Sequence, residues 1–233
     1  MKKALSYFSK AEIILWLSSS ALITIFFCLF DRNDFISLSA SLLGVTSLIF
    51  CAKGNPIGQV LVIIFSLFYA IISFQCSYYG ELITYVGMTL PMAIFSLVSW
   101  IKNPYDKSKG SEVKVGTLKK SDVVIMCLLA ISLTIIFYFI LKSLGTANLL
   151  VSTISIATSF SASFLMFKRS PYYALAYSIN DIILIILWTM ASVVDISYLS
   201  VTVCFIAFLA NDIYGFINWK NILKRQNNKS TSC

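Results

Sequence analysis

The sequence contains no histidine and little charge. Histidine is absent from all 233 residues, and only 12% of the residues are charged. Without histidine the chain lacks the commonest transition-metal ligand and the commonest general base. The hydrophobic fraction of 58% excludes an ordinary water-soluble domain, because such a chain cannot cover itself with polar surface. We therefore expect one integral membrane domain over 1–233, with neither a metal site nor a cofactor.

Paired cysteine motifs are also missing. The six cysteines include no Cys-x-x-Cys spacing, and four of them lie within apolar runs. This pattern is typical of cysteines that pack as small hydrophobic residues rather than forming a disulfide framework or binding a metal.

Long apolar runs make up most of the chain. Each is about 17–22 residues long, enough to cross a bilayer as a helix. No small-residue cleavage site follows the first run, so we expect it to remain as a helix rather than to be removed as a signal peptide. The sequence predicts an all-α membrane protein with spans at 13–30, 35–51, 57–74, 82–100, 122–142, 149–167, 172–190 and 197–218.

The basic residues indicate the orientation of these spans. With eight spans, 16 of the 18 lysine and arginine residues fall on one face, and only Arg32 and Lys142 lie on the other. Such an excess marks the cytoplasmic side, so both termini are predicted to be cytoplasmic. The net charge of +8 is therefore interpreted as a membrane topology signal, not as a nucleic-acid-binding surface.

A weak internal repeat relates two groups of three spans. Ser99-Trp100 near the end of the fourth span matches Asn218-Trp219 near the end of the eighth, and Pro56 and Pro171 precede the third and seventh spans. The repeat predicts a parallel three-plus-one-plus-three bundle. Its parts are an extra N-terminal helix at 13–30, a first repeat at 35–100, a cytoplasmic loop at 101–121, a linker helix at 122–142, a second repeat at 149–218 and a cytoplasmic tail at 219–233. The loop at 101–121 contains several lysines and a glycine, so we expect it to be solvated.

The dipeptide Asn-Asp occurs twice within apolar spans, as Asn180-Asp181 and Asn211-Asp212. A charged group near the middle of a membrane costs roughly 2.5–3.5 kcal/mol on insertion scales, so it is expected to face a bundle interior or a watery cavity. One interpretation is a polar chamber on a substrate pathway. The other is hydrogen bonding that holds packed helices together.

Polar and aromatic residues recur at helical spacing on four spans, and we expect these stripes to face inward. They comprise Gln59, Val62, Ser66, Tyr69 and Ser73; Tyr85, Met88, Thr89, Met92 and Ser96; Tyr173, Tyr177, Asn180, Asp181, Leu184 and Trp188; and Asn211, Tyr214 and Asn218, flanked by Asp212. Such a chamber suits a small ligand with an aromatic ring, an amide and hydroxyls, and a cationic ring would bind more strongly. Pro91 interrupts the fourth span and either kinks it or frees a carbonyl beside the chamber.

Other residues are predicted to have packing roles. Trp16, Trp100 and Trp219 lie near span ends and are assigned to the interfacial aromatic belt. The sixth span is rich in Ser, Thr and Ala and is interpreted as a packing helix. The first and fifth spans carry few polar residues and are expected to face lipid or to link other helices.

Several segments together form a recognisable set of motifs: Tyr79–Met92, Ser99–Pro104, Asn180–Leu184 with Leu187-Trp188, Asp195–Leu199 and Asn211–Trp219. They resemble the PnuC family of bacterial nicotinamide riboside transporters, and the resemblance extends over about 35–221. It implies a bundle similar to the SWEET proteins, a homotrimer in the bacterial inner membrane, and facilitated diffusion followed by cytosolic phosphorylation of the vitamer. The expected partners are nicotinamide riboside and membrane lipids, with no nucleic acid.

The expected substrate-binding residues come from two sources. The matched segments supply Thr89, Asn180, Asp181, Trp188, Asn211, Asp212, Tyr214 and Asn218, and helix geometry supplies Tyr69, Tyr85 and Tyr177. The substrate alternative is a related compound such as thiamine or another nucleoside. No catalytic residue is predicted.

Two further functional classes remain open at the level of the sequence. The two aspartates could form the catalytic pair of an intramembrane protease, although neither has the Gly-x-Gly-Asp context and no His-Glu-x-x-His motif is present. A membrane scaffold would instead pair Asp181 and Asp212 with neighbouring helices and leave no cavity. The aspartates of a transporter could bind a proton or sodium, or hydrogen-bond the substrate.

Overall fold

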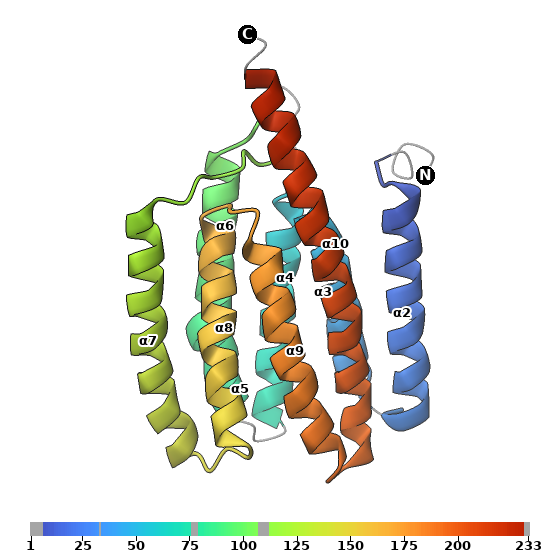
Figure 1. Ribbon diagram of the computed structural model, residues 1–233. Coiled ribbons are helices and arrows are strands. Elements are labelled where there is room, and N and C mark those ends of the chain that lie inside the picture. The colour runs from blue at the N-terminus through green and yellow to red at the C-terminus, as the bar shows by residue number, and fades with distance from the viewer. Residues whose placement is uncertain (1–6, 33, 76–78, 107–111, 231–233) are drawn as a thin grey trace.

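The computed structural model describes residues 7–32, 34–75, 79–106 and 112–230, and in these ranges it is a bundle of helices without β-strands (Figure 1). The side chains of Ser73 and Glu81 lie outside the described part. The helices are α2 (Lys10–Phe30), α3 (Phe35–Ala52), α4 (Ile57–Gln75), α5 (Tyr79–Thr84), the π-helix η1 (Tyr85–Thr89), α6 (Leu90–Lys102), α7 (Lys120–Ser143), α8 (Leu149–Phe167), α9 (Tyr173–Ser192), the 3-10 helix η2 (Ile196–Tyr198) and α10 (Leu199–Ser230).

The predicted spans coincide with these helices to within a few residues at most ends. Seven helices are long and apolar enough to cross a membrane, and the described apolar part of α4, Ile57–Ile71, is shorter. The outer surface is apolar as well: on α7, Leu128 is 61% exposed and Phe139 is 62% exposed. Large exposed apolar side chains along whole helices are expected where lipid is the solvent. The chain is an all-α integral membrane protein.

Six helical segments pack into a closed ring. In order around the ring, α3 packs on α4, α4 on α6, α6 on α8, α8 on α9, α9 on α10, and α10 on α3. Helix α7 packs against α8, and α2 packs against α10 and α3, so both lie outside the ring. Helix α2 begins and α10 ends at the same end of the bundle (Figure 1).

Trp100 and Trp219 meet in the core at this end. Both are 0% exposed, and their ring centroids are 5.5 Å apart. Trp100 Nε1 donates a hydrogen bond to the carbonyl of Met166 at 3.0 Å, and Trp219 Nε1 donates to that of Cys51 at 2.8 Å. Each indole thus binds one of the last carbonyls of a neighbouring helix, which lack partners within that helix. The assignment of these two residues to the interfacial belt was wrong, whereas Trp16 is 38% exposed.

The linker between α6 and α7 lies against the bundle in its described part. Val113 is 1% exposed and Val115 is 8% exposed. The amide of Val113 donates to the carbonyl of Gly54, and the amide of Gly116 donates to that of Arg169, both at 2.9 Å. Gly54 and Arg169 occupy the α3–α4 and α8–α9 turns, both with positive φ. The prediction of a solvated loop at 101–121 was therefore wrong for this stretch.

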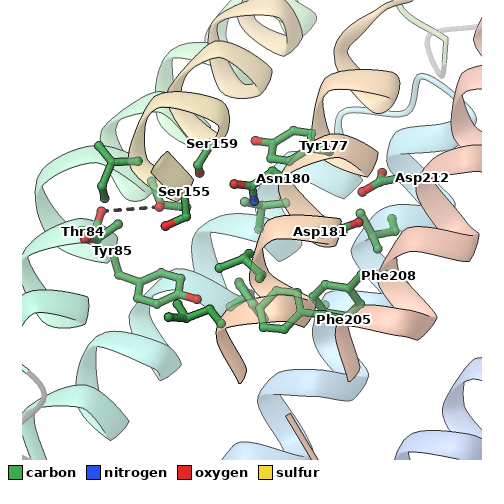
Figure 2. Close-up of a pocket in the computed structure, with 18 of the residues that line it drawn as sticks. Thr84, Tyr85, Ser155, Ser159, Tyr177, Asn180, Asp181, Phe205, Phe208 and Asp212 are labelled. Carbon is green, nitrogen blue, oxygen red and sulfur yellow. Dashed lines mark hydrogen bonds between the residues drawn. The ribbon is translucent and has the colours of Figure 1, made fainter. Parts of the chain in front are cut away.

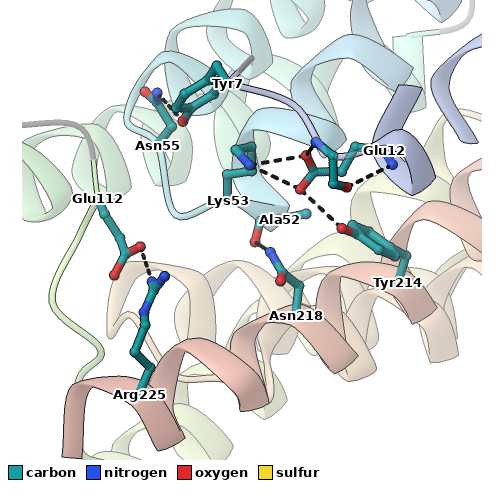
Figure 3. Close-up of polar contacts among 10 residues, drawn as sticks. Tyr7, Glu12, Ala52, Lys53, Asn55, Glu112, Tyr214, Asn218 and Arg225 are labelled. Carbon is teal, nitrogen blue, oxygen red and sulfur yellow. Dashed lines mark hydrogen bonds and ion pairs between the residues drawn. The ribbon is translucent and has the colours of Figure 1, made fainter. Parts of the chain in front are cut away.

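Helix α10 also continues beyond its predicted end. The segment predicted as a tail from 219 is helical as far as Ser230, and 231–233 lie outside the described residues. Gln226 is 7% exposed; its side chain accepts a hydrogen bond from the amide of Val115 and donates to the carbonyl of Val113. Arg225 forms an ion pair with Glu112 (Figure 3). These contacts attach the end of α10 to the linker.

Candidate functional site

A π-helix lies beside the centre of the ring. Between α5 and α6 the chain forms the π-helix η1, and the amide of Leu90 donates to the carbonyl of Tyr85, five residues back. Pro91 has no amide hydrogen, so the regular bond to the carbonyl of Gly87 cannot form. Widened turns of this kind often occur at functional sites. Tyr85 and Thr89, at the two ends of η1, both line the central cavity.

The cavity has a volume of about 190 Å³ and is bordered mainly by helices of the ring (Figure 2). Its lining combines aromatic rings, hydroxyls, one amide and two carboxyl groups, and it contains no lysine or arginine among the described residues. The polar side chains are those of Ser47, Thr84, Tyr85, Thr89, Thr146, Ser152, Ser155, Ser159, Tyr177, Asn180, Asp181 and Asp212. The aromatic hydrocarbon rings are those of Phe65, Phe205 and Phe208.

Six of the eleven predicted binding residues meet at this cavity. They are Tyr85, Thr89, Tyr177, Asn180, Asp181 and Asp212. They come from three segments that are distant in sequence, η1, α9 and α10, and the ring brings them together.

Neighbouring helices fix two of these side chains. Asn180 is 4% exposed, and its Oδ1 accepts a hydrogen bond from the hydroxyl of Thr158 at 2.8 Å. The hydroxyl of Tyr177 hydrogen-bonds that of Ser163 at 2.8 Å. Both partners lie on α8, so the α8–α9 contact orients an amide and a phenol at the cavity wall.

Asp181 and Asp212 form a buried carboxyl pair. They are 3% and 4% exposed, and their carboxyl groups lie within hydrogen-bonding reach of each other (Figure 2). Oδ2 of Asp181 receives no hydrogen bond from any described donor. The scaffold interpretation, with filled space between paired helices, does not describe this geometry, because both residues border open volume.

Two predicted residues lie behind the wall or away from it. The ring of Tyr69 packs against those of Phe65 and Tyr85, with centroids 4.6 and 5.0 Å apart. The ring of Trp188 packs against that of Tyr198 at 5.5 Å, near the end of α9. Neither residue borders the cavity, which Leu184 and Leu187 border on this part of α9.

The last three predicted residues bind other parts of the protein. Asn211 donates to the hydroxyl of Ser19 at 2.9 Å, and Tyr214 donates to a carboxylate oxygen of Glu12 at 3.0 Å. Both partners belong to α2. Asn218 donates to the carbonyl of Ala52 at 2.9 Å (Figure 3). These three residues therefore form hydrogen bonds between packed helices, which is the second of the two interpretations of the polar residues given above.

Helix α8 supplies cavity residues that the sequence analysis did not select. It packs against α7, α9 and α6, as expected of a packing helix, but Ser152, Ser155 and Ser159 also line the cavity. Their spacing of three and four residues places them on one helical face. This spacing was the available signal, and the high Ser, Thr and Ala content of the segment obscured it.

Comparison with known proteins identifies the family. The model of the nicotinamide mononucleotide transporter family matches residues 34–221. The nicotinamide riboside transporter PnuC of Neisseria mucosa is 22% identical over 223 residues, a match covering 94% of this chain and 83% of the relative. PnuC of Haemophilus influenzae is 20% identical over 214 residues, covering 92% of each chain.

A solved structure has the same fold. The crystal structure of the vitamin B3 transporter PnuC superimposes with a TM-score of 0.78 at 21% identity, covering 94% of each chain. The relatives are transporters rather than enzymes, which removes the intramembrane protease alternative. The family that the sequence motifs suggested is confirmed: this chain belongs to the nicotinamide mononucleotide transporter family, which includes the PnuC transporters.

Proposed function

We propose that this protein takes up nicotinamide riboside across the bacterial inner membrane through the central cavity. The observation that carries the proposal is the cavity lining: aromatic rings, hydroxyls, an amide and a carboxyl pair, without a lysine or arginine among the described residues. The riboside contains a cationic aromatic ring, a carboxamide and a ribose. The rings of Tyr85 and Tyr177 suit the pyridinium, the Asp181–Asp212 pair suits its charge, and hydroxyls on α8 suit the ribose.

The charge of the lining favours the riboside over the mononucleotide named in the family description. The mononucleotide carries a phosphate, which would lie beside two carboxyl groups with no cationic side chain to bind it. A buried anion without a compensating charge is strongly disfavoured. Thiamine, the alternative substrate, also has a cationic aromatic ring, so the lining charge does not discriminate against it.

The proposed contact residues are the six that line the cavity: Tyr85, Thr89, Tyr177, Asn180, Asp181 and Asp212. In this proposal Tyr69 packs behind the cavity wall, against Phe65 and Tyr85. Trp188 packs against Tyr198 near the end of α9. Asn211, Tyr214 and Asn218 hold α2 and the end of α3 in place and do not contact the substrate.

The transport mechanism that we propose is facilitated diffusion by alternating access between two three-helix repeats. The first is α3, α4 and α5–η1–α6, the second is α8, α9 and α10, α7 links them, and α2 lies outside. The packing supports a two-fold relation, because the third segment of each repeat contacts the first helix of the other. The crossed hydrogen bonds of Trp100 and Trp219 have the same symmetry. Rocking of two similar halves around a central site is common among transporters.

Orientation and assembly belong to the same proposal. The lysine and arginine distribution supports cytoplasmic termini, with loop 101–121 on the same side. The resemblance to the PnuC family supports a homotrimer and trapping of the substrate by cytosolic phosphorylation.

Counterflow of labelled nicotinamide riboside in liposomes tests the function. Vesicles containing the purified protein and unlabelled riboside should accumulate the label, and nicotinamide mononucleotide outside should not compete. Accumulation of labelled thiamine or mononucleotide in preference to riboside would refute the substrate assignment. Protein-free vesicles serve as the control.

A further inference from the structure

The central cavity is closed at the end of the bundle where α2 begins and α10 ends (Figure 1). Its lining there includes Cys51 and Met166, whose carbonyls accept the hydrogen bonds of the two buried indoles. Trp100 and Trp219 are both 0% exposed, so they separate the cavity from the surface at this end. At the other end the lining reaches Thr146, in the α7–α8 turn. In the proposed orientation, the structure is therefore a state closed toward the cytoplasm.

Hydrogen bonds between the two repeats meet at this closed end. Besides the bonds of the two indoles, the hydroxyl of Ser99 donates to the carbonyl of Phe167 at 2.9 Å. Asn218 donates to the carbonyl of Ala52, also at 2.9 Å. Each bond joins a helix of one repeat to a helix of the other. A rocking motion that opens this end has to break them.

The linker between α6 and α7 adds a short connection between the repeats. The amide of Val113 donates to the carbonyl of Gly54 in the α3–α4 turn of the first repeat. The amide of Gly116 donates to the carbonyl of Arg169 in the α8–α9 turn of the second, and both bonds are 2.9 Å long. Three residues of extended chain span at most about 11 Å. Because so short a stretch cannot follow two turns that move apart, one of the two bonds must then break.

This stretch of the linker is held on both sides. Val113 is 1% exposed and packs in the same cluster of buried side chains as the two indoles. Gln226 of α10 accepts a hydrogen bond from the amide of Val115 at 2.9 Å and donates to the carbonyl of Val113 at 3.1 Å. Gly116 lies so close to the α8–α9 turn that a Cβ atom would collide with the carbonyl oxygen of Lys168. A larger residue would therefore push the linker away from the second repeat.

We propose that residues 113–116 form a strap that keeps the cavity closed toward the cytoplasm, and that the cavity opens on this side when the strap releases one of the two repeats. The inference rests on the proposed function and orientation, and it adds the element that sets how often the cytoplasmic side opens. Release of the strap favours entry and exit of substrate equally. It therefore changes the rate of exchange and not the final distribution of the riboside, as facilitated diffusion requires.

Cys51 is a natural probe of opening, because it borders the cavity at the closed end and is 1% exposed. The other five cysteines are replaced by alanine, and a charged methanethiosulfonate reagent is added to the cytoplasmic face of inside-out vesicles. Gly116→Ala removes one attachment of the strap and should raise the rate of Cys51 modification at least about fivefold, the population shift expected when one buried hydrogen bond is lost. Lys114→Ala changes an exposed side chain of the same strap and is the matched control, with an unchanged rate expected.

Modification of Cys51 at the wild-type rate in folded Gly116→Ala protein would overturn the strap. Gln226→Ala detaches the strap from α10 and decides the same question if Gly116→Ala does not fold. Riboside counterflow by the same proteins separates this inference from the proposed function. Faster modification in the strap variants, with no riboside transport by the wild type, would support the strap and overturn the function. Riboside transport with equal modification rates in all variants would overturn the strap alone.

Discussion

At the scale of single residues, α9 offers a controlled comparison between its inner and outer faces. Leu184 lies one turn beyond Asn180 and borders the cavity, whereas Ile186, two residues later, is 50% exposed on the outer surface. Leu184→Trp should place an indole in the substrate site. Because overpacking costs about 1–3 kcal/mol, riboside binding should weaken by roughly 10- to 100-fold.

The matched variant Ile186→Trp places the same indole toward lipid and should transport at the wild-type rate. Binding by calorimetry and counterflow in liposomes provide the measurements. Normal transport by Leu184→Trp would show that the cavity is not the substrate site.

Neighbouring residues also show what the sequence could not predict at this scale. Asn211 and Asp212 are adjacent, yet Asp212 borders the cavity and Asn211 contacts Ser19 of α2. Periodicity identifies which residues share a helical face but not which neighbour that face meets. The rotation of α10 is set by its contacts with α2, α3 and α9 together, and such contacts are not encoded in a local pattern.

At the scale of elements, one buried carboxylate attaches α2 to the bundle. Glu12 is 2% exposed, caps its own helix through the amide of Ser9, pairs with Lys53 at 3.1 Å and accepts a hydrogen bond from Tyr214 (Figure 3). Glu12→Gln should lower the free energy of unfolding by about 1.5–3 kcal/mol, the usual contribution of hydrogen bonds to a charged group.

Thermal unfolding in detergent measures this effect, with the exposed Lys10→Gln as a neutral control. A double-mutant cycle with Lys53→Met should give a coupling energy clearly above zero, because the two charges are in contact. Additive effects of the two changes would contradict a role for this ion pair in holding α2.

The linker is a second element whose attachment can be tested. Gln226→Ala removes the acceptor for the amide of Val115 and the donor to the carbonyl of Val113. Hydrogen exchange at Val115 should then become at least about tenfold faster, since unsatisfied buried groups cost about 1–3 kcal/mol. Exposed Lys229→Ala should leave the exchange rate unchanged, and equal protection in both variants would refute the attachment.

In the linker and at the end of α10, the amino-acid composition indicated less ordered structure than these segments have. The lysine and glycine content of 101–121 favours a loop, but Val113 and Val115 alternate with the exposed Lys114, a pattern typical of a segment buried on one side. Trp219, Ile222 and Gln226 recur at helical spacing, which predicts a continuing helix. Polar residues around them end the apolar run without ending the helix.

At the scale of the whole molecule, the positions and order of the apolar helices follow directly from the apolar runs, and seven of these helices are long and apolar enough to cross a membrane. The closure of six segments into a ring does not follow from the apolar runs, because it depends on long-range contacts such as α3 with α10 and α6 with α8. The family motifs identified the protein class, while the cavity and the contribution of α8 required the three-dimensional arrangement.

The proposed orientation makes a prediction at this scale. A green fluorescent protein fused after residue 230 should fluoresce, and alkaline phosphatase fused after Thr146, in the α7–α8 turn, should be active outside the cytoplasm. Phosphatase fused within the α8–α9 turn at Arg169 is the matched control and should be inactive. The reverse pattern would place the termini outside.

The two buried indoles have a consequence for the integrity of the chain. Trp100 on α6 secures the end of α8, and Trp219 on α10 secures the end of α3, so the parts before and after the linker each complete a helix of the other. A protein cleaved between α6 and α7 should therefore remain a single particle. Two fragments produced separately should recover transport only when inserted into the same bilayer, where each supplies the indole that hydrogen-bonds a helix of the other.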